Sequence, residues 1–161
     1  MKIFPTNWKI ALIRTSGAVV IIVLTWLFFI QWFRTFGMSM KPTIHDGAIV
    51  FVNKLVYRFK PVKRGDIIVF RTSNRPYVYF IKRVIAFSGE KVEFKDGNLF
   101  INDRHVEEPY LSEKGNWNVE AFIVKDGKIF VCGDNRLTDW MFHFHPQISM
   151  KNITGRAIGY R

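Results

Sequence analysis

A serine in a turn-like stretch is the first residue of this sequence that suits chemistry. Ser39 lies in GMSMKPTI, between two methionines and just before Pro42. Gly37 lets a ligand backbone approach closely, and the proline rigidifies the chain as it leaves the turn. Such a hydroxyl acts as a nucleophile when a neighbouring base removes its proton. The same residues are typical of an ordinary turn, so this stretch alone leaves both roles open.

A lysine in an apolar run is the residue best suited to be that base. Lys82 and Arg83 interrupt the strand-like run YVYFIKRVIAF. On strict alternation the two side chains point to opposite faces of a strand, so we expect one of them to be desolvated. A desolvated lysine loses its proton more readily, and its neutral amine can deprotonate a serine hydroxyl. The alternative is a lysine at a sheet edge whose ammonium group reaches solvent.

Two further polar stretches lie near the C-terminus. The GDNR sequence of residues 133–136 is typical of a tight turn that an Asp134–Arg136 pair would stabilise without chemistry. His143 and His145 have an H-x-H spacing found in some metal sites. No third ligand is evident, so we expect no metal and no other cofactor. A G-x-S-x-G elbow and an S-x-x-K pair are both absent, which leaves a serine with a distant lysine.

A long uncharged run near the N-terminus indicates how these residues are held. Thr15–Phe33 contains no charge and is bounded by Arg14 and Arg34. As a helix it is long enough to cross a bilayer core of about 30 Å. Trp8 and Trp32 stand where interfacial indoles are expected. The run lacks the small-residue site of a cleavable signal, so it predicts an uncleaved membrane anchor, with a buried helix of a soluble core as the alternative.

The charges predict orientation and partners. Lys2, Lys9 and Arg14 precede the run, and no acid occurs before residue 34, which favours a cytoplasmic N-terminus and an extracytoplasmic remainder. The net charge is +11, and beside a membrane anchor such a basic surface favours anionic lipid over nucleic acid. The single cysteine, Cys132, excludes an intrachain disulfide.

The remainder of the chain has the pattern of an all-β domain. We expect residues 1–33 to form the cytoplasmic N-terminus and transmembrane helix, and residues 34–161 an extracytoplasmic domain of antiparallel sheets with a smaller β excursion around 90–126. Asp-Gly pairs at 96–97 and 126–127 each predict a short hairpin, and residues 107–120 an exposed loop. The β-rich runs that support this mainly β fold class are residues 48–57, 66–70, 77–87, 91–94, 98–102, 121–124, 128–133 and 156–160.

Together these stretches resemble the bacterial type I signal peptidases, membrane-bound serine/lysine proteases that remove signal peptides. GMSMKPTIHDGAIVFVNK is similar to the family's nucleophile box, S-M-x-P-T followed by a strand. KRGDIIVF and YFIKRVIAFSGEKV are similar to the next box and to the lysine box. NLFINDRHVEEPYL, FVCGDNR and ITGRAIGY resemble the later segments. The small size and single N-terminal anchor are most like Gram-positive members.

The resemblance implies an activity and its site residues. Ser39 would be the nucleophile, Lys82 the general base and the Ser39 backbone N–H the oxyanion donor. The substrate would be the signal peptide of a secreted preprotein, added as a strand beside the Ser39 and Lys82 segments. We expect a monomer in contact with membrane lipid, without nucleic acid.

Three positions depart from the family pattern after GDNR. The family's Ser, Asp and Arg correspond here to Asp139, Met141 and His143. The family serine orients the catalytic lysine, whereas a carboxylate at Asp139 would raise the pKa of Lys82 and favour its charged form. The lysine box also has Ala86 and Ser88 in place of Gly and Pro. A catalytically weak or inactive peptide-binding or surface-assembly factor is therefore the alternative function.

Overall fold

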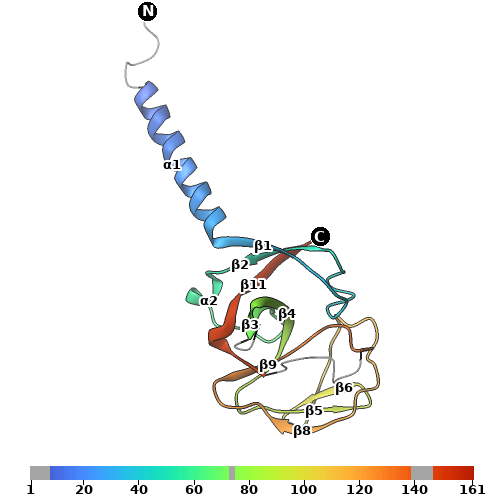
Figure 1. Cartoon of the computed structure of the whole chain (residues 1–161). Helices are drawn as coiled ribbons and strands as arrows, with labels where there is room; N and C mark the ends of the chain where they lie inside the picture. Colours follow the sequence, from blue (N-terminus) through green and yellow to red (C-terminus); the bar gives the residue numbers. More distant parts are fainter. Residues whose placement is uncertain (1–7, 73–74, 139–146) are drawn as a thin grey trace, which may run out of the picture.

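One long helix stands away from a body of β-strands (Figure 1). A computed structural model of the chain describes residues 8–72, 75–138 and 147–161. The elements follow in the order α1 (Trp8–Phe29), β1 (Ile30–Arg34), β2 (Ile49–Asn53), α2 (Val56–Phe59), β3 (Ile67–Thr72), β4 (Arg75–Phe87), β5 (Lys91–Lys95), β6 (Asn98–Ile101), β7 (Arg104–Val106), β8 (Val119–Ile123), β9 (Lys128–Cys132), β10 (Gln147–Ser149), η2 (Met150–Asn152) and β11 (Ile153–Tyr160).

The helix α1 ends inside the apolar run that the sequence assigned to an anchor. At Ile30 the chain passes directly into β1, so the last residues of that run form a strand instead of helix. The reason is pairing, because β1 lies antiparallel to β2 with Trp32 opposite Phe51. The side chains of α1 stay exposed, for example Ile21 at 66% and Leu24 at 60%. Among the residues that the structure describes, we find no helix with both the length and the apolar character needed to cross a membrane.

Seven strands form the larger sheet, in the order β1-β2-β11-β3-β4-β9-β10. Each neighbouring pair is antiparallel, which confirms the mainly β, antiparallel fold class. The expected run 48–57 is a strand only as far as Asn53. The Asn53 side chain then accepts hydrogen bonds from the N–H groups of Leu55 and Val56, which starts the short helix α2.

Four strands form a second sheet, in the order β7-β6-β5-β8, at the end of the body opposite to α1 (Figure 1). The hairpin expected at Asp96 and Gly97 is confirmed, with φ angles of 47° and 74° between β5 and β6. The second Asp-Gly pair makes no hairpin. It connects the two sheets, because β8 pairs with β5 whereas β9 pairs with β4 and β10.

A shared core joins the two sheets. It contains Ile85 from β4 and Phe130 from β9, packed with Phe94 from β5 and Trp117 from the segment before β8. Trp117 is therefore buried, although the sequence assigned residues 107–120 to an exposed loop. The remaining members of this cluster are Ala86, Val92, Leu99, Ile101, Val124 and Cys132.

A buried ion pair lies at the same junction. The Arg136 guanidinium donates to both carboxylate oxygens of Glu108, at 2.8 and 2.6 Å, and lies over the rings of Phe94 and Trp117. The two side chains are only 1% and 4% exposed. Burial of two charges is tolerated here because they neutralise each other in a bidentate geometry.

The Arg136–Glu108 pair predicts a large loss of stability on partial removal. Glu108→Gln keeps the shape but leaves a buried guanidinium without its counter-charge, so we expect the free energy of unfolding to fall by about 3 kcal/mol. Denaturant titration in detergent measures this loss. The exposed Lys91–Asp103 pair is the control, and Asp103→Asn should cost less than about 1 kcal/mol. Equal losses in the two variants would contradict the prediction.

Candidate active site

Ser39 lies on the loop between β1 and β2, held by buried neighbours. Met40 and Ile44 enter the core beneath the loop, while Ser39 itself is half-buried. The N–H of Ile44 donates to the Met40 carbonyl at 2.9 Å. Gly37 has a φ of 97°, a conformation that favours glycine, and its N–H donates to Asp46 at 2.7 Å. The loop is therefore fixed at both ends around the serine.

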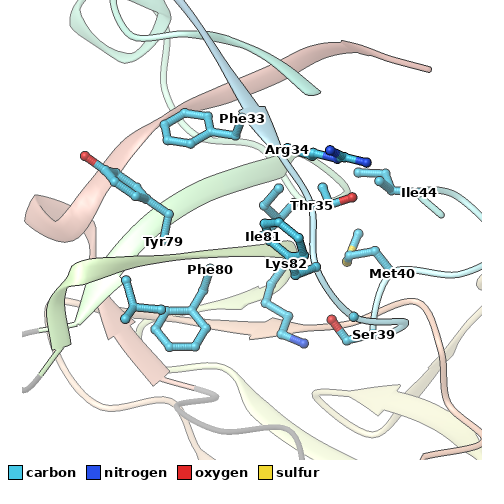
Figure 2. Close-up of a pocket in the computed structure, with 13 residues that line it drawn as sticks. Phe33, Arg34, Thr35, Ser39, Met40, Ile44, Tyr79, Phe80, Ile81 and Lys82 are labelled. Atoms are coloured by element: carbon cyan, nitrogen blue, oxygen red, sulfur yellow. The ribbon is translucent and has the colours of Figure 1, made fainter. Parts of the chain in front are cut away.

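Lys82 comes from β4 and is aimed at this loop. Its side-chain nitrogen points toward the Ser39 hydroxyl in Figure 2, and Lys82 is only 8% exposed. Burial lowers the pKa of Lys82 below its ordinary value, against the opposing influences of Cys132 and Asp134, which raise it. The structure thus brings together the serine and the lysine singled out in the sequence, in an environment that favours the neutral amine.

Arg83, the next residue along β4, is also buried but keeps its charge. Desolvation alone would lower the pKa of Arg83, but the hydrogen bonds and charge of Asp134 raise it. Arg83 donates to the two Asp134 oxygens at 2.8 and 2.5 Å and to the Gly65 carbonyl at 2.9 Å, and it lies 3.8 Å from the Tyr110 ring centroid. Lys82 and Arg83 are therefore both desolvated, whereas only one of the two was expected.

The turn of residues 133–136 holds the loop that carries Ser39, the proposed nucleophile. Asp134 accepts a hydrogen bond from the Thr43 hydroxyl at 2.5 Å. The Asn135 backbone N–H donates to the Ser39 carbonyl at 3.0 Å, and its side-chain amide donates to the Met38 carbonyl at 3.2 Å. The Asp134–Arg136 pair expected from the sequence is wrong, because Asp134 binds Arg83 and Arg136 binds Glu108.

A groove of about 300 Å³ runs between the loop and β4 (Figure 2). Within the described part of the chain, β9 pairs with β4 only from Arg83 onward, so residues 78–82 have an open edge beside the groove. The lining is mainly apolar, and Ser39 and Lys82 lie at one end of it. The other lining residues are Phe33, Arg34, Thr35, Phe36, Gly37, Met40, Ile44, Val78, Tyr79, Phe80 and Ile81.

Several candidates from the sequence lie outside the described residues, and two residues at the loop were not predicted. Asp139, Met141, His143 and His145 lie outside the described residues. Sequence reasoning missed Thr43 and Asn135, both of which contribute hydrogen bonds at the loop. Asn135 lies within the GDNR stretch, where the residue types indicate a turn stabilised by its charged neighbours.

The chain is similar to known proteins over most of its length. The family described as signal peptidase, peptidase S26, matches residues 8–159. Signal peptidase I of Bacillus licheniformis is 40% identical over 146 residues, covering 81% of this chain and 77% of that protein. Signal peptidase I of Bacillus caldolyticus is 33% identical over 154 residues, covering 87% and 84%. A crystal structure of a signal peptidase I from Enterococcus faecalis matches with a TM-score of 0.48 and 28% identity, covering 60% of this chain and 97% of that one.

Burial of Lys82 predicts a pH-dependent cost to stability. Below its ordinary pKa of 10.5 the unfolded lysine binds a proton that the folded one holds less readily, so wild-type stability rises as the pH increases toward 10.5. Methionine fills a similar volume without titrating. We expect Lys82→Met to be more stable than wild type at pH 7, with an advantage that shrinks toward pH 10.5.

Denaturant titrations in detergent at both pH values measure this effect. The exposed Lys125→Met is the matched control and should show no such change with pH. An advantage of Lys82→Met that is equal at both pH values would show that the buried amine is not the cause.

Proposed function

The chain belongs to the signal peptidase family, peptidase S26, and from this premise we propose that Ser39 and Lys82 carry out its reaction. Relatives that align with most of the chain are named signal peptidase I, so the protein is a serine endopeptidase that removes signal peptides from secreted preproteins. The observation that carries the assignment of the two residues is the desolvated Lys82 amine directed at the Ser39 hydroxyl.

The proposed mechanism uses the neutral amine of Lys82, which burial favours by lowering the pKa of this group. The neutral amine takes the proton of the Ser39 hydroxyl while the serine oxygen attacks the carbonyl of the last signal-peptide residue. The resulting oxyanion accepts a hydrogen bond from the Ser39 backbone N–H. The Lys82 ammonium then gives its proton to the leaving amine, and an acyl-enzyme remains. Lys82 deprotonates a water molecule, which hydrolyses the acyl-enzyme and restores Ser39.

The substrate would bind as an added strand. The open edge of residues 78–82 offers backbone groups, and the loop before Ser39 forms the opposite wall of the groove. Main-chain hydrogen bonds give a peptide affinity, and the pockets under alternate side chains give selectivity. The apolar lining fits an A-x-A sequence, because small apolar side chains can enter it without leaving a polar group unpaired.

We also place the protein at the cell membrane, held through the exposed apolar side chains of α1. These side chains do not belong to any buried core cluster of the described residues, and such a large exposed apolar surface indicates contact with lipid or with another protein. The catalytic part would begin at Ile30, where β1 joins the sheet, instead of residue 34. A cytoplasmic N-terminus, an extracytoplasmic catalytic face, a monomeric state and the absence of nucleic acid stay predictions.

Loss of either proposed catalytic residue should abolish cleavage. We expect Ser39→Ala and Lys82→Ala to cut a preprotein with an A-x-A site at least about a thousandfold more slowly than wild type, since the hydroxyl and its base act as one unit. The rate is measured with purified protein in detergent. The exposed Lys125→Ala is the control and should cut normally. If wild type cuts no faster than Ser39→Ala, Ser39 is not the nucleophile, and absence of cleavage by both would support the inactive peptide-binding alternative.

The apolar surface of α1 should be needed for lipid binding. The full chain is expected to float with phospholipid vesicles, and the double variant Ile21→Asp with Leu24→Asp should float much less, because charged groups in lipid are costly. Ile123→Asp is the matched control, since Ile123 is 56% exposed but belongs to the second sheet. If both variants lose flotation to the same extent, α1 is not the specific lipid contact.

A further inference from the structure

The side chain of Asn135 makes a hydrogen bond to the loop that carries Ser39, and this bond has no role in the mechanism proposed above. Its amide nitrogen donates to the Met38 carbonyl at 3.2 Å, across 97 residues of sequence. The backbone N–H of the same residue donates to the Ser39 carbonyl at 3.0 Å. Two successive carbonyls of the loop therefore face one residue of the 133–136 turn.

The orientation of the Asn135 amide is fixed by a second hydrogen bond. The Leu137 N–H donates to the Asn135 side-chain oxygen at 3.2 Å. A backbone N–H can only donate, so the oxygen of the amide must face Leu137 and the NH₂ group must face Met38. The contact with the Met38 carbonyl is therefore a hydrogen bond that the amide NH₂ group donates to the carbonyl oxygen.

Because the peptide bond is planar, the hydrogen bond to the Met38 carbonyl also determines where the Ser39 N–H points. The Met38 carbonyl and the Ser39 N–H belong to one planar trans peptide, and they point in opposite directions. Holding the carbonyl toward Asn135 therefore directs the Ser39 N–H away from it. Among the described residues, no hydrogen bond from the Ser39 N–H competes for this donor.

We propose that Asn135 is a positioning residue that sets the direction of the Ser39 N–H, and through it the stabilisation of the oxyanion. This inference rests on the proposed function, in which Ser39 is the nucleophile and its N–H the oxyanion donor. Electrostatic stabilisation of this kind depends on donors that are already oriented before charge develops. Asn135 supplies that orientation from outside the groove, since it is not one of the described residues that line it.

The loop needs such a restraint because its own packing is sparse at this peptide. Met38 is 58% exposed, and a Cβ placed on Gly37 would have no atom within 4 Å. The next peptide is held differently, by the Asn135 backbone N–H, which no side-chain substitution removes. A variant at Asn135 therefore frees the Met38–Ser39 peptide selectively, while Thr43 still ties the loop to Asp134.

Two inhibitors separate oxyanion stabilisation from general binding. One is a signal-peptide fragment that ends in an aldehyde at the position of the scissile carbonyl, and the other is the same fragment ending in a primary alcohol. The aldehyde forms a tetrahedral adduct with Ser39 whose oxygen occupies the oxyanion position, whereas the alcohol fills the groove only. Affinities of both are measured for wild type, Asn135→Ala, Asn135→Asp and Ser39→Ala in detergent.

We expect both Asn135 variants to lose at least about tenfold in aldehyde affinity and in kcat, with alcohol affinity and KM nearly unchanged. Asn135→Asp is the sharper variant, because it keeps the acceptor for Leu137 and replaces the donor to Met38 with a carboxylate oxygen that repels the Met38 carbonyl. Asn118→Ala is the matched control. Asn118 also bonds a backbone group in a turn, but that turn lies in the second sheet, and the variant should bind both inhibitors like wild type.

Two results would overturn the inference. If aldehyde and alcohol affinities fall together, Asn135 merely supports the groove, and if neither changes, the Ser39 N–H is oriented without it. Failure of the proposed function gives a different pattern: Ser39→Ala would then bind the aldehyde as tightly as wild type does.

Discussion

The ion pair between Arg83 and Asp134 is the interaction on which the arrangement of the site depends. Arg83 directly follows Lys82 on β4, and Asp134 also accepts a hydrogen bond from Thr43 on the loop that carries Ser39. One carboxylate therefore connects the strand of the proposed base, Lys82, to the loop of the proposed nucleophile, Ser39. Because Asp134 is fully desolvated, loss of either partner would leave a buried charge uncompensated, which makes the connection difficult to break.

Neighbouring bases on one strand have opposite electrostatic requirements, and strand geometry satisfies both. In the proposed mechanism Lys82 gives up its proton, whereas Arg83 keeps its charge beside Asp134. Successive side chains of β4 point to opposite faces, so Arg83 meets Asp134 while Lys82 enters the apolar groove. Asp134 still opposes the lowering of the Lys82 pKa, but desolvation outweighs it. Arg83 neutralises the Asp134 carboxylate, which limits how far that carboxylate can raise the pKa of Lys82.

The sequence could predict those features that depend on residues close together in the chain. The period of two along residues 77–87 correctly separated Lys82 from Arg83, and most β-rich runs became strands. Hydropathy could not find the end of α1 at Phe29, because Ile, Trp and Phe suit a buried strand as well as an apolar helix. The pairing of Arg136 with Glu108 depends on the fold, which brings together residues far apart in the chain. The role of Asn135 could not be predicted because its partners are backbone groups, which have no signature in residue type.

The direct passage from α1 into β1 fixes the spacing between the end of the helix and Ser39. No linker residue separates Phe29 from Ile30, and β1 continues through Phe33 and Arg34 into the wall of the groove. The path from the end of the helix to Ser39 is thus a paired strand followed by a braced loop, with little freedom to lengthen or swing. The end of the helix is therefore held at a set distance from Ser39 by a spacer of fixed length.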